Sequence, residues 1–294
     1  MADRPGELVA VGNTSTVLRW GTHHVVKLLD AATPPHWAPL EAGWTASLHA
    51  LGLPVPEVTD LVECDGRPGI VFRHVPGPTM LERILTAPTT VAGFGRQLAD
   101  LQHEIHRTPP PDDLPRLRDR LERKTREATT LSASNRRRAL AQLDRLPDGD
   151  ELCHGDLHPG NIILAAEGPV VLDWFDVAIG HCCADVVRTS ILIRPRVHTP
   201  APRYLPGSSN PLLERLHRAY LAAYLERSGA ELAELARFEV PVAAARLCEP
   251  GQHADLVSWL QGLDGQPTPQ TAAAAAVTLS AGIHRSDQAA VGGG

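Results

Sequence analysis

His154-Gly155-Asp156-Leu157-His158-Pro159-Gly160-Asn161 is the stretch of this sequence that decides its fold. It holds an acid, Asp156, and an amide, Asn161, five residues apart. A second acid, Asp173, follows twelve residues after Asn161 and ends the apolar run Val170-Val171-Leu172. Because β-branched apolar residues favour strands, the pattern predicts an acid and an amide in a loop and a second acid at the end of a strand.

This order of acid, amide and strand-terminal acid is typical of kinase-like phosphotransferases. In such a site Asp156 takes or orients the proton of the acceptor hydroxyl, while Asn161 and Asp173 bind the magnesium ions that bridge the phosphates of ATP. Magnesium prefers oxygen ligands, so an amide oxygen and a carboxylate suit it. The alternative is a solvated turn, because His, Asp, Pro, Gly and Asn favour turns. The complete string with Asp173 at this distance is more specific than HGD alone and favours the phosphotransferase hypothesis.

Size and charge exclude several classes of protein. The chain has 294 residues, 43% of them hydrophobic, which is enough for one large domain or two small ones. Its net charge of −6 and pI of about 6.1 argue against nucleic acid as the main partner. The N-terminus lacks a basic region followed by an apolar core, and the apolar tract 272–283 is too short to span a bilayer. We therefore expect a cytoplasmic protein with no membrane partner.

The five cysteines contain no CxxC pair. An odd number of cysteines in a cytoplasmic chain indicates reduced thiols. His181-Cys182-Cys183 has residue types found in metal sites, but no second cluster with ligand spacing accompanies it. We expect buried thiols there.

The first third of the sequence is rich in strand patterns. We predict a hairpin or meander over residues 7–30, a helix over 38–52, and two further strands over 58–64 and 69–74. Pro76-Gly77-Pro78 then breaks the pattern.

The remainder is mostly helical in pattern. Helices are predicted over 91–106, 210–228, 231–248 and 253–263, with loop and short strands over 153–176. Residues 114–146 are rich in Arg and predict one or two exposed amphipathic helices; a basic patch that binds a polyanion is the weaker interpretation. The sequence thus predicts an α+β, two-lobed fold. A small β-rich lobe over 1–76, with a hinge at about 73–77, precedes a larger helical lobe over 77–265 and a flexible tail over 266–294.

Lys27 lies in an apolar predicted strand, where a charge is costly unless it is paired or exposed. Arg supplies nearly all the positive charge of this chain, and Lys27 and Lys124 are its only lysines. A kinase-like site needs a point cation here for the α and β phosphates, and Glu41, expected in the first turn of the following helix, is its natural partner. The alternatives are an edge-strand Lys27 in solvent and a Glu41 that merely favours the helix dipole.

Gly12-Asn13-Thr14-Ser15-Thr16 is predicted to cover the phosphates with its backbone N–H groups and hydroxyls. By itself it is an ordinary hairpin turn with one glycine, and only its place two strands before Lys27 supports the prediction.

On these residues the chain resembles the aminoglycoside phosphotransferase and choline-kinase-like family of small-molecule kinases, a branch of the protein-kinase-like fold. The resemblance covers roughly residues 6–260. It rests above all on HGDLHPGN and Leu172-Asp173-Trp174, supported by Lys27, Glu41 with the following Gly52-Leu53-Pro54-Val55-Pro56, the linker Val75-Pro76-Gly77, and the segment Leu98-Ala99-Asp100-Leu101-Gln102-His103.

The resemblance implies a role for each matching residue. Asp156 is the catalytic acid/base, Asn161 and Asp173 are magnesium ligands, and Lys27 with Glu41 positions ATP. The backbone of the linker Phe72–Val75, including Arg73 and Val75, contacts adenine. His154, His158 and Asp185 support the catalytic loop, with a phosphate contact as the alternative for His158.

Two residues depart from the pattern of the family. Arg73 stands where members often place an acid, so a side-chain contact from this position is in doubt. Cys182 replaces a frequent proline, which is expected to alter the stiffness of the loop but not the chemistry.

The expected reaction is transfer of the γ-phosphoryl group of ATP to a hydroxyl of a small molecule. An amine-bearing sugar such as an aminoglycoside is the favoured acceptor, because acids are common in the C-terminal helical region; Glu249 and Asp255 flank the break Pro250-Gly251 and are the first candidates to bind it. The alternatives are a metabolic kinase for an amino alcohol, a sugar or a homoserine-like acceptor, and a nucleotide-binding pseudokinase. The sequence leaves the oligomeric state open.

Overall fold

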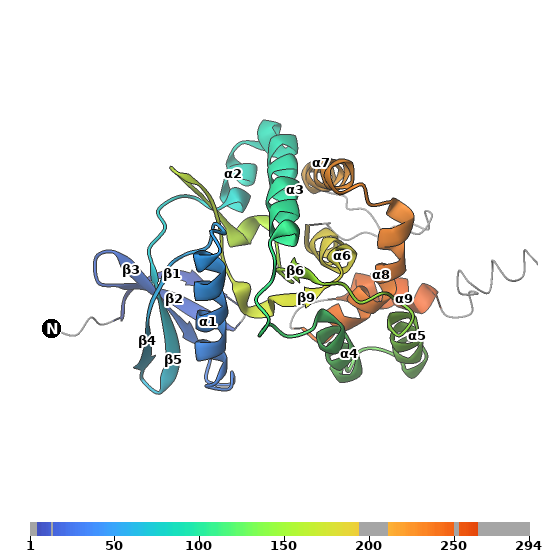
Figure 1. Cartoon of the computed structure of the whole chain (residues 1–294), viewed down its shortest axis with the longest axis horizontal. Helices are drawn as coiled ribbons and strands as arrows, with labels where there is room; N and C mark the ends of the chain where they lie inside the picture. The colour runs from blue at the N-terminus through green and yellow to red at the C-terminus, as the bar shows by residue number, and fades with distance from the viewer. Residues whose placement is uncertain (1–4, 13, 194–210, 250–252, 264–294) are drawn as a thin grey trace, which may run out of the picture.

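The structure is a computed structural model that describes residues 5–12, 14–193, 211–249 and 253–263. The described residues form a small β-rich lobe and a larger, mainly helical lobe (Figure 1). This is the α+β, two-lobed architecture that the sequence predicts. The predicted tail over 266–294 and Asn13 of the predicted phosphate loop lie outside the described residues.

The N-terminal lobe is a five-stranded antiparallel sheet with the strand order β1-β2-β3-β5-β4. Its strands are β1 (Pro5–Val11), β2 (Ser15–Trp20), β3 (His24–Leu29), β4 (Val58–Cys64) and β5 (Arg67–Arg73). Lys27 lies on the central strand β3, and only 8% of its surface is exposed. The interpretation of Lys27 as an edge-strand residue in solvent is therefore wrong.

Helix α1 (Trp37–Ala50) covers one face of this sheet. Successive side chains of a strand point to opposite faces. On β3, Leu28 packs into a cluster on one face, whereas Leu29 packs with Ala42 of α1 on the other. Lys27 alternates with Leu28, so it shares the face that α1 covers.

The connection between the lobes runs from Arg73 to helix α2 (Met80–Thr86) and includes the predicted hinge at about 73–77. Thr79 caps α2 by accepting a hydrogen bond from Glu82 N at 3.1 Å, and the Glu82 carboxylate accepts one in return from Thr79 N at 2.7 Å. Gly77 has φ 149°, and a Cβ added to it would lie 2.6 Å from the Leu164 carbonyl oxygen. Only glycine fits there.

The helical lobe contains the rest of the described chain. Its helices are α3 (Val91–Arg107), α4 (Leu117–Glu127), α5 (Ala133–Leu143), α6 (Cys182–Ile193), α7 (Pro211–Ser228), α8 (Leu232–Arg246) and α9 (Ala254–Gly262). Two short antiparallel pairs flank the segment predicted to be catalytic: β6 (Glu151–Cys153) with β9 (Ala178–Gly180), and β7 (Ile162–Ala165) with β8 (Gly168–Val171). One large hydrophobic cluster packs these elements together.

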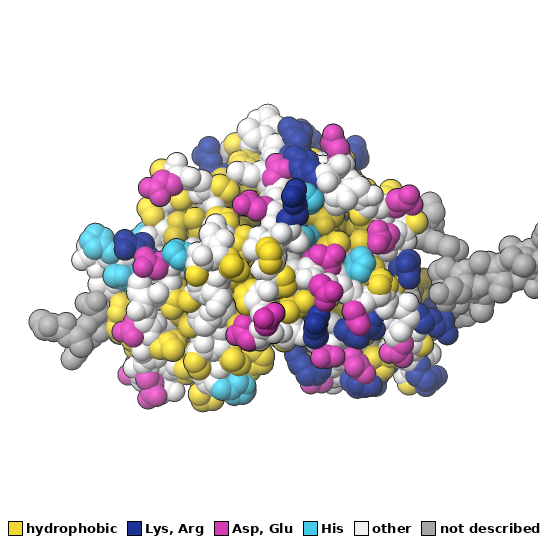
Figure 2. Space-filling view, viewed as in Figure 1, with side chains coloured by type: hydrophobic (Ala, Val, Ile, Leu, Met, Phe, Trp, Pro, Cys, Tyr) yellow, Lys and Arg dark blue, Asp and Glu magenta, His cyan; other side chains and the backbone are white. Residues whose placement is uncertain are grey.

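The Arg-rich stretch forms the two helices α4 and α5. Figure 2 shows Lys and Arg gathered around these helices, but with Asp and Glu among them. Arg123 pairs with Glu127 at 2.9 Å and Arg126 with Glu122 at 2.6 Å. The surface of α4 and α5 is therefore mixed in charge. Arg120 is only 9% exposed and so is not part of this surface.

All five cysteines are free thiols in the structure. The prediction of buried thiols at Cys182 and Cys183 is correct for Cys183, whereas Cys182 is partly exposed. Elsewhere Cys153 is buried, and Cys64 and Cys248 are partly exposed. Among the described residues, no helix combines the length and the apolar character needed to cross a membrane.

Candidate active site

The catalytic loop follows strand β6 and leads into β7. Gly155 has φ 81°, and a Cβ added to it would lie 2.3 Å from the Asp176 carbonyl oxygen. Positive φ and this close approach both require glycine. Gly155 therefore lets the loop press against the segment that follows Asp173, and it sets the position of Asp156 next to it.

His154 joins the catalytic loop to the second acid-bearing segment. It is fully buried and stacks on Trp174 with ring centroids 4.5 Å apart. Its Nδ1 accepts a hydrogen bond from Asp156 N at 3.1 Å, and its Nε2 lies 3.0 Å from the Leu172 carbonyl oxygen. An acceptor Nδ1 and a donor Nε2 define the neutral tautomer. With both nitrogens engaged, His154 supports the loop and is not placed to act as a base.

The Asp156 carboxylate has different neighbours on its two oxygens. Arg188 donates to Oδ1 at 2.7 Å, whereas Asn161 Nδ2 lies 3.4 Å and His158 Nε2 lies 3.7 Å from Oδ2. Asn161 Nδ2 also donates to the Asp156 carbonyl at 3.0 Å. His158 Nδ1 accepts from Gly160 N at 3.0 Å, so this ring braces the loop. Asp156, Asn161 and His158 thus lie together, as the sequence predicts.

Lys27 connects the two lobes. Its Nζ lies 2.6 Å from Glu41 Oε1 on α1 and 2.7 Å from Asp173 Oδ1 in the helical lobe. Burial alone would lower the pKa of Lys27, but the carboxylates of Glu41 and Asp173 raise it above its usual value. Lys27 is therefore a fixed cation between the lobes.

Glu41 differs from the prediction in its place on the helix. Helix α1 begins at Trp37 and has no acid in its first turn, so Glu41 lies in the second turn. The interpretation of Glu41 as a helix-start acid is wrong. Its side chain is 1% exposed, and its contact with Lys27 accounts for the buried charge.

Asp173 lies just beyond strand β8 in a left-handed backbone conformation, with φ 62° and ψ 68°. A residue other than glycine pays for this conformation with about 1–3 kcal/mol, and such residues cluster at functional sites. Burial would raise the pKa of Asp173, but Lys27 outweighs that effect and lowers it. The carboxylate is thereby kept ionised and turned towards Lys27.

Asp185, at the start of α6, is a buried anchor for the catalytic loop. It accepts hydrogen bonds from Gly155 N at 2.7 Å and from His154 N at 3.2 Å. Gln102 Nε2 and His106 Nε2 of helix α3 lie 2.9 Å and 3.0 Å from its Oδ2. Burial opposes ionisation, but the contacts with His106 and Gln102 lower the pKa of Asp185 to about 2. Asp185 therefore supports the loop as a charged acceptor.

The predicted nucleotide contacts lie in the N-terminal lobe. Gly12 N donates to the Ser15 carbonyl at 2.8 Å, and Asp30 N donates to the Thr14 carbonyl at 2.9 Å, so the turn between β1 and β2 is held at both sides. Thr16, the last residue of the predicted phosphate loop, lies on strand β2, and its hydroxyl lies 3.5 Å from Arg67 Nη2.

In the linker, the Arg73 side chain donates to Glu57 at 2.7 Å. The Arg73 side chain is therefore paired with a residue of its own, N-terminal lobe. Val75, two residues on, is partly exposed in the connection between the lobes.

Five charged residues surround the catalytic loop although the sequence analysis did not place them at the site. They come from helices α4, α6 and α8 and from the segment after Asp173. They are Arg120, Lys124, Asp176, Arg188 and Arg246. Two had local signals. Arg188 follows Asp185 by three residues and so lies on the same face of α6, and Lys124 is the second of only two lysines.

Asp176 is held by cations from the N-terminal part of the helical lobe. Lys124 Nζ lies 3.1 Å from Asp176 Oδ2, and Arg120 Nη1 lies 3.7 Å from its Oδ1. Burial would raise the pKa of Asp176, but Lys124, Arg120 and Arg188 lower it to about 2.

Glu249 lies near the catalytic acid, but its partners differ from those of an open acceptor site. Lys124 Nζ lies 3.0 Å from Oε1, Arg188 Nη2 lies 2.8 Å from Oε2, and Arg246 also pairs with Oε2. Burial raises its pKa, but these three cations lower it overall. An acceptor amine at Glu249 would have to compete with a cation already in place. Asp255 lies in the first turn of α9, after the break predicted around Pro250.

The predicted magnesium ligands suit the ion chemically. Asn161 uses its amide nitrogen to bond Asp156, which leaves the oxygen as the metal-binding atom. Asp173 supplies an ionised carboxylate whose side chain is 44% exposed although Lys27 beside it is buried. Both donors are hard oxygens, so the pair fits Mg²⁺.

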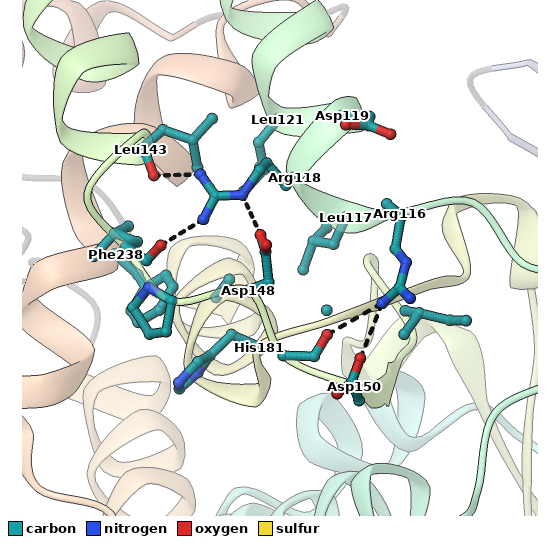
Figure 3. Close-up of a pocket in the computed structure, with 16 residues that line it drawn as sticks. Arg116, Leu117, Arg118, Asp119, Leu121, Leu143, Asp148, Asp150, His181 and Phe238 are labelled. Atoms are coloured by element: carbon teal, nitrogen blue, oxygen red, sulfur yellow. Dashed lines mark hydrogen bonds and ion pairs between the residues drawn. The ribbon is translucent and has the colours of Figure 1, made fainter.

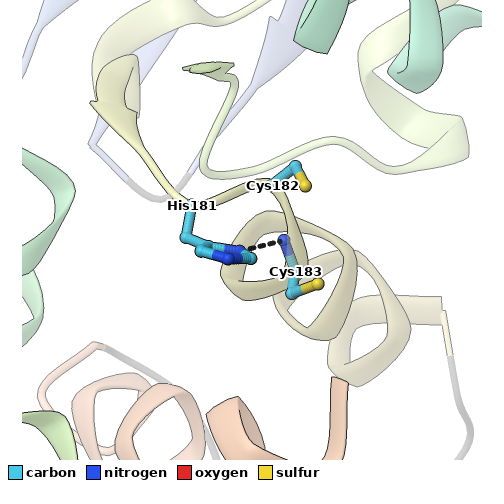
Figure 4. Close-up of side chains that lie close together, drawn as sticks. All are labelled: His181, Cys182 and Cys183. Carbon is cyan, nitrogen blue, oxygen red and sulfur yellow. Dashed lines mark hydrogen bonds between the residues drawn. The ribbon is translucent and has the colours of Figure 1, made fainter. Parts of the chain in front are cut away.

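Two features of the helical lobe lie away from the catalytic acid. A cavity of about 340 Å³ lies between α4, the segment after α5 and the start of α6; Figure 3 shows Arg118 and Arg116 at its walls bonded to Asp148 and Asp150. His181, Cys182 and Cys183 offer ligand atoms within 4.8 Å of one another (Figure 4). His181 Nδ1 accepts a hydrogen bond from Cys183 N at 3.2 Å, so this ring nitrogen already has a partner.

Comparison with known proteins places the fold. The sequence model of a family described as a phosphotransferase enzyme family matches residues 6–217. No curated protein matches the sequence.

Solved structures with the same fold include a thermostable mutant of an aminoglycoside phosphotransferase in a ternary complex with AMP-PNP and hygromycin B. The two sequences are 16% identical, the match covers 89% of this chain and 94% of the solved chain, and the TM-score is 0.60. An aminoglycoside phosphotransferase from Streptomyces rimosus, in complex with ADP and streptomycin, is 18% identical over 81% of this chain and 92% of its own, with a TM-score of 0.55. A choline/ethanolamine kinase family protein from Mesorhizobium loti is 20% identical over 90% of this chain and 82% of its own, with a TM-score of 0.52.

Proposed function

Because the chain belongs to the phosphotransferase enzyme family and is a phosphotransferase that acts on hydroxyl groups, we propose that it transfers the γ-phosphoryl group of ATP to a hydroxyl of a small molecule. One observation carries this proposal. Lys27 of the N-terminal lobe reaches Asp173 of the helical lobe at 2.7 Å, in the same site as Asp156 and Asn161. A cation for phosphates, a metal-binding pair and an acid for the acceptor thus lie in one place.

In this mechanism the phosphates of ATP lie between Lys27 and the turn over Gly12–Thr16. Glu41 holds Lys27 in position for the α and β phosphates. Asn161 and Asp173 would hold magnesium, whose charge would neutralise that of the phosphates. The backbone of the linker around Arg73 and Val75 faces adenine.

Asp156 orients the acceptor hydroxyl and receives its proton. The acceptor oxygen forms a bond to the γ-phosphorus as the bond from that phosphorus to the bridging oxygen of ADP breaks. Because the transition state of phosphoryl transfer is loose, positioning and neutralisation of charge contribute more than the basicity of Asp156. His154, His158 and Asp185 act by holding the loop that carries this carboxylate.

The acceptor we propose first is an amine-bearing sugar such as an aminoglycoside, which would make the enzyme one that modifies antibiotics in the cytoplasm. Two of the solved relatives have aminoglycosides bound. The helical lobe outside the Arg-rich stretch also carries more acidic than basic side chains, and acidic surfaces attract cationic ligands.

A metabolic kinase is the second candidate, and the contacts of Glu249 favour it. Lys124, Arg188 and Arg246 surround this carboxylate. Of the two candidate acceptor-binding acids, Glu249 and Asp255, it is Glu249 that shares a partner with Asp156, and it lies among cations. Such surroundings suit an acceptor with a carboxylate, such as a homoserine-like molecule, better than a polyamine.

The test is an acceptor panel with radiolabelled ATP and magnesium, containing aminoglycosides, amino alcohols, sugars and homoserine-like compounds. Label is expected to pass to at least one acceptor in the wild-type protein and to none in Asp156→Asn. If the protein binds ATP but labels no acceptor and releases no phosphate, the pseudokinase alternative replaces this proposal.

A further inference from the structure

Arg188 on helix α6 makes three contacts that join the catalytic loop to the end of helix α8. Its Nε donates to the Gly155 carbonyl at 3.0 Å, and its Nη2 donates to Asp156 Oδ1 at 2.7 Å and to Glu249 Oε2 at 2.8 Å. We propose that Arg188 is a positioning residue for the catalytic acid, and that Glu249 holds Arg188 in its working orientation. The inference rests on the proposed phosphotransferase function.

The contacts of Arg188 restrain both the backbone and the side chain of the loop. A guanidinium is planar, so bonds from Nε and Nη2 to neighbouring groups fix the direction of the whole side chain. With Oδ1 held by Arg188, the other oxygen of Asp156 is directed to the side of Asn161, where the phosphates and magnesium are expected. Arg188 therefore sets the plane of the carboxylate that the acceptor hydroxyl meets.

Burial makes this restraint rigid. The Arg188 side chain is 10% exposed and that of Glu249 is 18% exposed, against 26% for Asp156. Water competes little for these bonds, and a charge–charge contact is stronger where water is excluded. The arrangement therefore keeps its geometry when an acceptor enters or leaves.

Glu249 keeps Arg188 from turning away from this geometry. It lies after helix α8, beyond the residues that the family model matches, and it also pairs with Lys124 and Arg246. This second carboxylate balances the charge of Arg188 and ties it to the C-terminal helices. Those helices are where this fold is expected to bind its acceptor, so the acceptor region and the catalytic acid share one side chain.

Arg118 of helix α4 provides a control from the same lobe. Its guanidinium donates to the Leu143 and Leu146 carbonyls and pairs with Asp148, at the wall of the cavity that lies away from Asp156. Among the described residues, Arg118 makes no hydrogen bond or ion pair with residues 154–161. Arg118→Gln therefore measures what the loss of a structural guanidinium costs in stability without the contact to the catalytic acid.

The experiment compares wild type, Arg188→Gln, Arg188→Lys, Glu249→Gln, Arg188→Gln/Glu249→Gln and Arg118→Gln. For each, kcat, acceptor KM, nucleotide affinity and melting temperature are measured, with the best acceptor of the panel. Misplacing a catalytic group by about 1 Å can cost about 10²-fold in rate, so Arg188→Gln is expected to lower kcat by about that factor with nucleotide affinity unchanged. Arg188→Lys should recover part of the loss, because it keeps the positive charge. The recovery should be incomplete, because an ammonium lacks the fork that reaches both groups.

Glu249→Gln should lower kcat less than Arg188→Gln, and the double variant should be no worse than Arg188→Gln, because Glu249 acts through Arg188. Arg118→Gln should lower the melting temperature while its kcat per folded molecule stays near that of wild type. A wild-type kcat in Arg188→Gln, or an equal loss in Arg118→Gln, overturns the proposal.

Amide hydrogen exchange of the nucleotide-free protein gives a readout that needs no acceptor. Arg188→Gln should speed exchange in the peptide 154–161, and Arg118→Gln should leave it unchanged. Unchanged protection of this peptide in Arg188→Gln overturns the positioning role whether or not a substrate is known. An inactive wild-type protein whose loop protection does depend on Arg188 would instead count against the phosphotransferase function alone.

Discussion

At the scale of single residues, Asp156 carries the clearest consequence for catalysis. Its carboxylate lies beside Asn161 and Arg188, and among the described residues it makes no hydrogen bond or ion pair with Lys27. We therefore expect it to act on the acceptor and not on the nucleotide.

Asp156→Asn should nearly abolish transfer and leave ATP affinity largely intact. Loss of a positioned acid or base costs about 10²–10⁴-fold in rate. Turnover and ATP affinity measured on the same preparation test this, and wild-type turnover in the variant would remove Asp156 from the mechanism.

Asp173→Ala should remove productive magnesium binding, because it deletes the ionised carboxylate next to Lys27. Asn161→Ala should raise the magnesium requirement less, since it removes no charge. The measurement is activity as a function of magnesium concentration for both variants. A magnesium dependence identical to that of wild type in Asp173→Ala would exclude this residue as a ligand.

At the scale of elements, the site depends on how strand β3 and helix α1 face each other. Lys27 points to the face of β3 opposite the apolar cluster that contains Leu28. The second turn of α1 places Glu41 Oε1 2.6 Å from Lys27 Nζ. Neither element places the pair alone.

Lys27→Ala should weaken the use of ATP, and Glu41→Ala should act through the same pair. Residues in one ion pair are not additive, so the double variant should be little worse than Lys27→Ala. The measurement is kcat/KM for ATP in the complete cycle; losses that simply add would mean that Glu41 acts independently of Lys27.

Helix α6 anchors the catalytic loop through Asp185, and this gives the stability a pH dependence. The pKa of Asp185 is lowered to about 2, whereas an unfolded Asp has a pKa of about 3.9. A lowered folded-state pKa stabilises the protein above the unfolded pKa, by about 2–3 kcal/mol here. That contribution falls as the pH drops from about 4 towards 2.

Asp185→Asn should therefore be less stable than wild type at neutral pH, and the difference should shrink as the pH falls through this window. Urea unfolding over a pH series measures it, with the exposed Asp113→Asn as control. A difference that is the same at pH 7 and near pH 2 would mean that ionised Asp185 contributes nothing to stability.

At the scale of the whole molecule, charge distribution bears on the acceptor. The helical lobe carries an excess of acids outside the Arg-rich stretch. Around Asp156 the cations Arg120, Lys124, Arg188 and Arg246 are matched by four acids, which are Asp156 itself, Asp176, Asp185 and Glu249. Long-range attraction therefore favours a cationic acceptor, whereas the local site, whose charges balance, adds no such preference.

The acceptor KM over an ionic-strength series separates the two candidates. Salt screens attraction between exposed charges, with a Debye length of about 10 Å at 0.1 M. For an amine-bearing acceptor KM should rise with salt. If the best acceptor in the panel is neutral or anionic and its KM does not rise, the metabolic kinase becomes the better candidate.

The sequence by itself determined the architecture and the chemical type of the site. Strand alternation, helical periodicity and turn residues are local properties, so most of the longer elements could be predicted to within a few residues, including helices in the Arg-rich stretch. Helices α2 and α6 were not predicted. The spacing of Asp156, Asn161 and Asp173 identified the reaction class, because residues that share one loop and the strand after it stay close in any compact fold.

Only the tertiary structure decided which charges meet. Lys124 and Glu249 are 125 residues apart in sequence and lie 3.0 Å apart in space, because α4 and the end of α8 pack against the same side of the catalytic loop. The sequence marks Glu249 as an acid near a break but contains no local signal for its three cationic partners. Likewise, the start of α1 at Trp37 placed Glu41 one turn deeper than predicted. The energy of an ion pair depends on distance and burial, and both are set by packing between elements that the local pattern does not encode.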